Sequence, residues 1–130
     1  MNPGSVTFPL LVDGLKKTYR SKGPDGFQAV KGISFSIKPG ECFGLLGPNG
    51  AGKSTSMNCI TGFFPATAGT VRILGLDVHT QPREARSLLG VCQQDDTLDS
   101  DFTALDQLVR FATYFGVPTR VGLERANSLL

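Results

Sequence analysis

The nine-residue stretch GPNGAGKST, residues 47–55, constrains what this chain can fold into more than any other part of the sequence. It matches the pattern G-x-x-x-x-G-K-[ST], in which glycines let successive backbone N–H groups point into one concavity that holds phosphate oxygens. In such a loop the ammonium group of Lys53 reaches the β- and γ-phosphates of a nucleoside triphosphate, and the Ser54 hydroxyl binds Mg²⁺. The stretch therefore predicts a phosphate-binding loop, followed by a helix whose positive dipole end faces the phosphates.

The sequence on either side of the glycine-rich stretch supports this interpretation. Residues 41–46, ECFGLL, form a short apolar run that is typical of a strand buried on both faces. Residues 53–61 are predicted to form a helix that places Met57 and Ile60 on one side and ends at Gly62. The order strand, glycine loop, helix is the one that the motif requires. It disfavours the alternative, a surface turn that contains a lysine by chance.

Composition limits the other possibilities. With 130 residues, 40% of them apolar, the chain has the size and hydrophobic content of one folded domain. Its formal net charge of +2 is too small to indicate a nucleic-acid-binding surface. We expect neither a membrane-spanning segment nor a signal peptide. The three cysteines, Cys42, Cys59 and Cys92, are expected to be small buried apolar residues in a reducing compartment, which favours a cytosolic protein.

Ahead of the glycine-rich loop, the sequence predicts a loose lead-in over residues 1–9 followed by antiparallel strands. The first strand spans residues 10–19. A polar segment with a Pro-Asp-Gly turn signal, residues 20–26, is typical of a hairpin loop. Two further strands are expected at residues 27–30 and 33–37, the second because it alternates apolar and polar side chains.

Beyond the first helix, glycine, proline and capping residues delimit a series of shorter elements. The expected elements are strands at 70–74 and 90–94 and helices that start at Pro82, Thr103 and Thr119. The helix from Thr103 to about Phe115 carries an apolar stripe, made of Leu105, Leu108, Val109, Ala112 and Phe115. The last helix shows no stop signal at Leu130, which indicates a helix that continues in a longer protein.

Further short motifs accompany the glycine-rich loop. They are Tyr19, Val30, GISF at 32–35, TG at 61–62, GTV at 69–71 and GVCQQ at 90–94. Together with GLLGPNGAGKST they resemble the N-terminal half of the ATP-binding subunit of ATP-binding-cassette (ABC) transporters, from about Leu10 to Leu130. The segments LDSDFT at 98–103 and YFG at 114–116 are most similar to the ATPases of drug-resistance and nodulation-factor exporters.

The resemblance implies an α/β fold: a P-loop NTPase-like (RecA-like) core with an N-terminal antiparallel β subdomain, truncated before the Walker B strand. Residues 1–9 would be the lead-in, and residues 10–130 the N-terminal portion of an ABC-type nucleotide-binding domain. In the intact domain the Walker B strand would lie beside residues 42–46. Without that strand we expect an exposed apolar edge, which invites self-association or marginal stability.

The resemblance also implies a role for each site residue. Tyr19 would stack on adenine, because an aromatic face accepts a purine ring, and Val30 would cover the ribose. Gln94, as the Q-loop glutamine and the one catalytic candidate, would complete the Mg²⁺ shell with Ser54 and report nucleotide state to the membrane subunit. Gln93 is the competing assignment. The backbone amides that would hold the phosphates are those of Asn49, Gly50, Ala51, Gly52, Lys53, Ser54 and Thr55.

Each of these residues also has an ordinary structural explanation. Tyr19 could simply pack at the end of an edge strand, Val30 could be a plain strand residue, and Gln94 a polar strand end. The pair Asp95–Asp96 is better interpreted as part of a solvated loop than as a metal-binding pair. His79, the one histidine, is expected at the surface without an assigned role.

Several parts of a complete ATPase are missing from this sequence. Hydrolysis needs a second acidic strand end for Mg²⁺ and a residue that orients the attacking water. The sequence has neither four apolar residues ending in Asp-Glu nor an S-G-G-Q signature. We therefore expect the chain to bind ATP and Mg²⁺ weakly and to be inactive alone.

Partners follow from the same resemblance. A transmembrane permease subunit and a second nucleotide-binding domain would place the protein at the cytoplasmic face of a membrane, where ATP hydrolysis drives transport. No nucleic acid is expected. Two alternatives stay open. One is a module that holds nucleotide, or docks a partner through residues 103–115, without turnover. The other is a different P-loop enzyme, although the missing N-K-x-D sequence and Tyr19 count against a GTPase.

Overall fold

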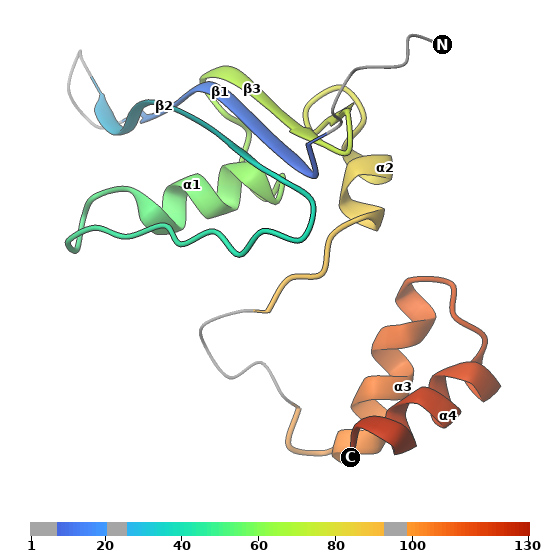
Figure 1. The fold of residues 1–130 in the computed structure, drawn as a ribbon. Helices are drawn as coiled ribbons and strands as arrows, with labels where there is room; N and C mark the ends of the chain where they lie inside the picture. The colour runs from blue at the N-terminus through green and yellow to red at the C-terminus, as the bar shows by residue number, and fades with distance from the viewer. Residues whose placement is uncertain (1–7, 21–25, 93–98) are drawn as a thin grey trace, which may run out of the picture. The chain divides into compact units, whose positions relative to one another are not determined.

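An antiparallel sheet forms the first part of the molecule (Figure 1). The computed structural model describes residues 8–20, 26–92 and 99–130, and the chain divides into two units, residues 1–90 and 91–130. The strands are β1 (Leu10–Tyr19), β2 (Phe27–Ile37), β3 (Ala68–Ile73) and β4 (Leu76–Asp77), and their order in the sheet is β2-β1-β3-β4. All neighbouring strands are antiparallel, so β1, with partners on both sides, is a central strand.

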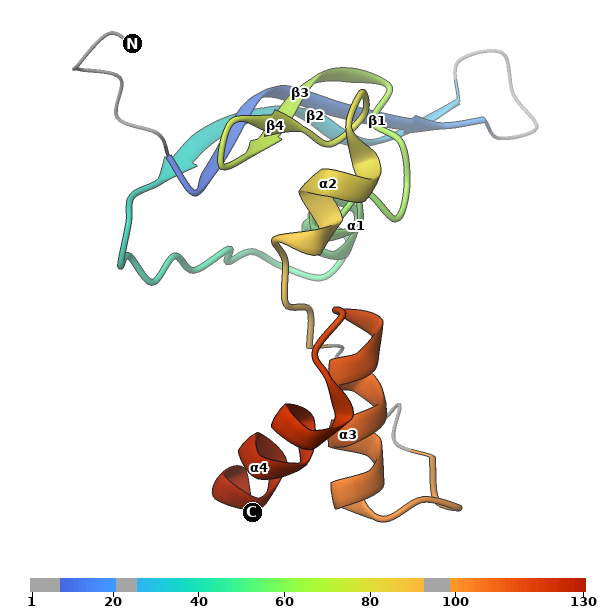
Figure 2. The ribbon, with the colours of Figure 1, turned by 90° about the vertical axis from the view of Figure 1, so that its right-hand side faces the viewer.

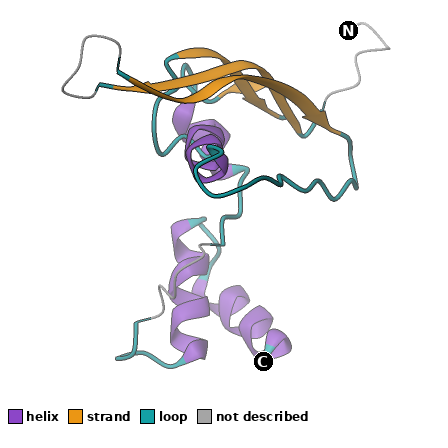
Figure 3. Ribbon diagram, turned by 90° about the vertical axis from the view of Figure 1, so that its left-hand side faces the viewer, coloured by secondary structure: helices purple, strands orange, loops and turns teal. Residues whose placement is uncertain are grey.

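Two helices lie on one side of this sheet, as Figure 2 and Figure 3 show. Helix α1 (Lys53–Ile60) packs on β1 and β2, and the short helix α2 (Pro82–Ser87) packs beside β4. The core between sheet and helices is made of small and branched apolar side chains, a set that suits close packing of a helix on a pleated surface. It consists of Val12, Leu15, Val30, Cys59, Ile60, Val71, Ile73, Val78 and Ala85.

The second unit is a pair of helices, α3 (Ala104–Tyr114) and α4 (Thr119–Leu129). Thr103 caps α3: its hydroxyl accepts the Asp106 N–H at 3.1 Å and donates to the Asp106 carboxylate at 2.6 Å. This reciprocal pair satisfies a helix-end N–H that would otherwise lack a partner. Helix α4 packs on α3 through small residues, Gly122 and Ala126, which are the buried positions of α4.

Most elements expected from the sequence are present. Strand β1 has the predicted bounds, α1 ends one residue earlier than predicted, and Gly62 terminates it with a positive φ of 70°. The two strands expected at 27–30 and 33–37 are one strand, β2, because both halves pair with β1. The expected strand 70–74 is β3, which begins two residues earlier.

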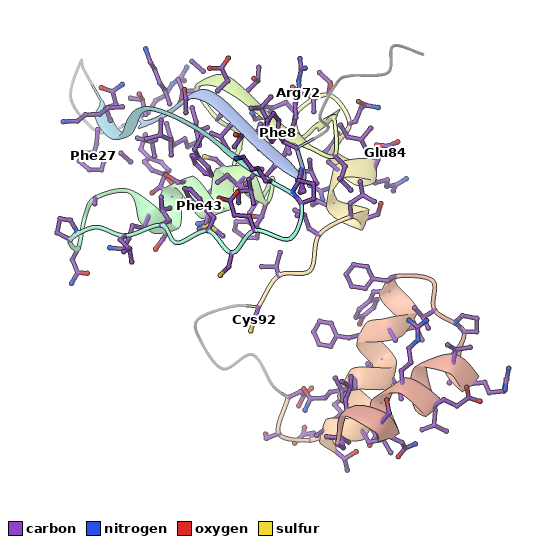
Figure 4. All side chains as sticks on the ribbon, viewed as in Figure 1. Phe8, Phe27, Phe43, Arg72, Glu84 and Cys92 are labelled. Atoms are coloured by element: carbon purple, nitrogen blue, oxygen red, sulfur yellow. The ribbon has the colours of Figure 1, made fainter. Side chains whose placement is uncertain are left out.

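The prediction of a buried strand at residues 41–46 is wrong. This segment is extended but forms no strand, and its apolar side chains are largely exposed, with Leu46 at 93%. Its contact with the sheet is made by Phe43 (labelled in Figure 4), whose ring stacks on that of Phe35 in β2 at a centroid distance of 4.7 Å. A strand needs a hydrogen-bonded neighbour, and no strand in the described part of the chain pairs with this segment.

Other expectations need smaller corrections. Met57 is half exposed rather than buried with Ile60, and Cys42 and Cys92 are exposed, whereas Cys59 is fully buried. Burial raises the pKa of the Cys59 thiol, an effect that the nearby charge of Lys17 partly offsets.

The remaining corrections concern the C-terminal helices and the segment ahead of them. Residues 90–92 form no strand, while Gln93 and Gln94 lie outside the described residues, as does most of the expected lead-in. Pro118, not Thr119, occupies the N-cap of α4. The stripe expected on α3 is only half buried: Leu105, Val109 and Ala112 are partly covered, whereas Leu108 and Phe115 are exposed.

Candidate functional site

The glycine-rich loop connects the extended segment 41–46 to helix α1. Its turn is closed by the Ala51 N–H, which donates to the Pro48 carbonyl at 3.2 Å. Gly50 and Gly52 have φ values of 82° and 87°, a left-handed conformation that side-chain-bearing residues avoid. The two glycines predicted to shape the loop therefore do so through their backbone conformation.

Gly52 also brings the loop against the sheet. A Cβ atom at this position would lie 2.4 Å from the Ala29 carbonyl oxygen and 3.4 Å from the Val30 side chain. Only a residue without a side chain allows so close an approach. The start of α1 is thereby fixed on β2, beside the residue that the sequence assigned to the ribose.

The backbone N–H groups in the first turn of α1 receive no side-chain cap. Gly52 is its N-cap and provides no side-chain hydrogen bond, and no acidic residue occupies the first turn. The first N–H groups of a helix have no partner within the helix, and the helix dipole adds positive potential there. This helix end therefore suits an anion such as a phosphate group.

Lys53 lies folded back over the loop. Its ammonium group donates to the Gly47 carbonyl at 2.6 Å and to the Pro48 carbonyl at 2.8 Å. These two bonds hold a positive charge at the loop, which leads directly into the first turn of α1. The Lys53 charge and the α1 donors together make the loop complementary to a polyphosphate.

The hydroxyl groups at the start of α1 differ in whether they form a hydrogen bond within the protein. Ser56 is buried and its hydroxyl donates to the Gly52 carbonyl at 2.8 Å, which stabilises the helix start. Among the described residues, the side chains of Ser54 and Thr55 form no hydrogen bond, and Ser54 is exposed. The Ser54 hydroxyl is thus available to a ligand, as the motif predicts for a Mg²⁺-binding serine.

Tyr19 ends β1 at the edge where β2 begins. It pairs with Phe27, which is labelled in Figure 4 and lies two residues before Ala29, the contact point of Gly52. With a rise of about 3.3 Å per residue, Phe27 and Ala29 are about 7 Å apart along β2. Tyr19 therefore lies at the same end of the sheet as the loop.

Two neighbours of Tyr19 were not anticipated from the sequence. The Phe64 ring meets the Tyr19 ring edge to face, at 88° and 6.4 Å between centroids, and the Lys17 ammonium lies 5.1 Å from the Tyr19 centroid. The alternation of side chains along a strand, which puts residues 17 and 19 on one face, was the one available signal for Lys17. Phe64 had none.

Of the other residues singled out from the sequence, some are described by the structure and some lie outside its described residues. Val30 is 4% exposed and belongs to the core, so its burial agrees with the packing explanation and leaves a ribose contact untested. Gln94, Asp95 and Asp96 lie outside the described residues. His79 is exposed, as predicted, and its ring nitrogen accepts the Ala66 N–H at 3.3 Å.

The residues that the structure describes offer no metal-binding cluster as a second site. They contain no group of three or more His, Cys, Asp or Glu side chains placed to hold a metal ion. None of their helices has the length and hydropathy required to cross a bilayer.

A family model and curated proteins match this sequence. The ABC transporter family model matches residues 30–128. The chain is 41% identical over 129 residues to the Nod factor export ATP-binding protein I of Ralstonia nicotianae, a match that covers 98% of this chain and 39% of that protein. The chain thus spans about two fifths of the length of this curated relative.

Solved structures show the same fold. A dimeric ATP-binding cassette in a post-hydrolysis state, bound to ADP and Pi, has a TM-score of 0.77 at 25% identity, over 92% of this chain and 54% of that one. A part of an ABC transporter complex from Clostridium perfringens gives a TM-score of 0.74 at 26% identity, over 94% of this chain and 49% of that one.

Proposed function

This chain belongs to the ABC transporter family and has the P-loop NTPase fold, and from that premise we propose that it binds ATP through the loop at residues 47–55. The observations that support the proposal most lie within one loop and the helix turn that follows it: the Lys53 ammonium held at the loop carbonyls, a first turn of α1 with no side-chain cap, and an exposed Ser54 hydroxyl. Positive charge, free N–H donors and a hydroxyl are the groups that recognise a nucleotide polyphosphate with its metal ion.

Each part of the nucleotide has a proposed contact. The backbone amides from Asn49 to Thr55 hold the phosphates, Tyr19 stacks on adenine, and Val30 lies under the ribose. Mg²⁺ would be bound by Ser54, with Gln94 as a second ligand, and would supply charge neutralisation between phosphate oxygens. The free Ser54 hydroxyl fits that role, because hydroxyl oxygen is a suitable ligand for this hard cation.

The chain's place in a larger assembly is also a proposal. Residues 10–130 would form the N-terminal portion of a nucleotide-binding domain that pairs with a second such domain and with a transmembrane permease. That assembly would sit at the cytoplasmic face of a membrane and couple ATP hydrolysis to transport. Because an acidic strand end and the S-G-G-Q signature are missing here, this chain would bind ATP without turning it over alone.

A partner-docking module without turnover is the second candidate. The observation that favours it is a group of exposed aromatic side chains on and just after α3, with Phe111 at 55%, Tyr114 at 73% and Phe115 at 57% exposure. Exposed aromatic clusters mark contact surfaces in many proteins. This role does not conflict with ATP binding, since it belongs to the other unit.

Calorimetric titration of the 130-residue chain with Mg²⁺-ATP tests the main proposal. We expect measurable binding that Lys53→Ala abolishes, because it removes the charge at the loop. Lys38→Ala is the matched control: Lys38 is exposed and lies outside the loop, so its loss should leave binding unchanged. Equal binding by the Lys53→Ala variant would remove the P-loop assignment. Hydrolysis by the unsubstituted chain that Lys53→Ala abolishes would overturn the claim that it lacks turnover.

A further inference from the structure

The ammonium group of Lys17 is held at three points beside Tyr19. It donates to the Pro65 carbonyl at 2.6 Å, and it lies 5.1 Å from the Tyr19 ring centroid and 5.9 Å from the Phe64 centroid. A lysine side chain at a surface normally samples many conformations, and fixing it costs entropy. A charge-assisted hydrogen bond together with two cation–π contacts offsets that cost.

These contacts restrict the Tyr19 ring. The ammonium lies over one of its faces, and Phe64 meets the ring edge to face at 88°. Edge-to-face pairs of this kind prefer a definite mutual orientation. With one face covered by a cation, a planar ligand can stack only on the opposite face of Tyr19.

The same contacts connect Tyr19 to the helix that begins at the phosphate loop. The N–H groups of Phe63 and Phe64 both donate to the Asn58 carbonyl in α1, at 2.9 and 3.1 Å. The segment that carries Phe64 and Pro65 is therefore anchored to the end of α1, whose other end carries Lys53. Through Lys17 the ring position of Tyr19 is fixed relative to the phosphate-binding residues.

We propose that Lys17 is a positioning residue for the base of the bound nucleotide. Its ammonium, anchored on the Pro65 carbonyl, holds the Tyr19 ring against Phe64, so that the base stacks on the ring face opposite the ammonium. The inference rests on the proposed function, because it assumes that the nucleotide occupies the loop at residues 47–55. It concerns the base alone, so the phosphates should bind equally well without Lys17.

Tyrosine fluorescence provides a direct readout. The sequence contains two tyrosines and no tryptophan, so in a Tyr114→Phe background all the intrinsic fluorescence comes from Tyr19. Stacking of adenine should quench this signal. Inorganic tripolyphosphate, which has no base, should bind without quenching, and a tyrosine amide measured alongside corrects for absorption by ATP.

Two substitutions in that background separate a positioning role from a structural one. Lys17→Met keeps the length of the side chain but removes its charge and its donor. We expect it to lower the quenching at saturation and to raise the Kd for ATP about threefold, the size of a surface cation–π contact. Lys17→Arg keeps a cation and a donor, and it should retain both the quenching and the affinity. The Kd for tripolyphosphate, measured by calorimetry, should be the same in all three proteins.

The outcomes that overturn the proposal are distinct. Unchanged quenching and ATP affinity in Lys17→Met would show that Lys17 does not position the ring. Equal weakening of ATP and tripolyphosphate would show a general structural effect, and failure of Lys17→Arg to retain binding would exclude the cation as the cause. If the unsubstituted chain bound neither ligand, the proposed function itself would fall together with this inference. Binding of both ligands without a Lys17 effect would remove the inference alone.

Discussion

At the scale of single residues, Gly52 joins the phosphate loop to the sheet. Its φ of 87° and the 2.4 Å approach of a would-be Cβ to the Ala29 carbonyl are two separate reasons for glycine at this position. Gly50 has a similar φ of 82°, but a Cβ there would meet no heavy atom within 4 Å. Comparing substitutions at Gly50 and Gly52 therefore separates the free-energy cost of the backbone conformation from that of steric overlap.

Alanine substitution at these two positions should therefore have unequal effects. Gly50→Ala should lower the free energy of unfolding by about 1 kcal/mol, the cost of the left-handed conformation. Gly52→Ala should lower it by about 2–3 kcal/mol, because the new methyl group must also displace the Ala29 carbonyl. Urea denaturation followed by circular dichroism measures both values. Equal losses would show that Gly52 is required for its backbone conformation alone.

The sequence identifies those candidate site residues that belong to one continuous motif. Lys53 and the loop glycines are recognisable because consecutive residues build the concavity themselves. Lys17 and Phe64 were missed, because their contact joins residues 47 positions apart, a separation that only the paired strands and the turn after α1 bring together. Cys42 and Cys92 show the same limit: apolar neighbours in sequence do not ensure burial, which depends on what lies opposite.

At the scale of elements, helices were predicted better than strands. The bounds of α1 and α3 follow from local signals, Gly62 after the first and the Thr103 cap before the second, which act within a few residues. The segment 41–46 has the apolar composition of a buried strand, but strand formation requires a partner that composition does not reveal. The expected break within residues 27–37 is absent for the converse reason, because β1 pairs with both halves.

The turn between β3 and β4 offers a test at this scale. Its two residues, Leu74 and Gly75, both have positive φ values, 48° and 87°, as a type I′ hairpin turn requires. Leu74 is the only residue other than glycine with positive φ among those the structure describes. A leucine there is strained, since its Cβ approaches the following carbonyl oxygen.

Leu74→Asn should stabilise the first unit. Asparagine tolerates the left-handed conformation, and Asn-Gly is a preferred type I′ pair, so we expect a gain of about 1 kcal/mol in the free energy of unfolding. Leu88→Asn is the matched control: Leu88 is as exposed as Leu74, at 47% against 48%, but has an ordinary φ of −95°. Urea denaturation should show no gain for the control. A gain of the same size in both variants would mean that removing an exposed leucine, not relieving the turn, is responsible.

At the scale of the whole molecule, the segment before the phosphate loop is an exposed apolar edge. Phe43 is 42% and Leu46 93% exposed, and the backbone of residues 42–46 pairs with no strand in the described part of the chain. An extended segment with free N–H and C=O groups is a template for pairing with another chain. The family resemblance implied an exposed apolar edge here, although the sequence predicted a strand where the structure has none.

We therefore expect the isolated chain to associate reversibly through residues 42–46. Leu46→Lys should reduce this association, because a charged side chain on an unpaired edge disfavours the burial that pairing requires. Leu88→Lys, which places the same charge on an exposed leucine of the same unit outside residues 42–46, is the matched control. Sedimentation velocity over a range of protein concentrations should show a weaker concentration dependence for Leu46→Lys than for the control. If the two variants and the unsubstituted chain associate alike, the contact lies elsewhere, and the exposed edge is protected by its own conformation.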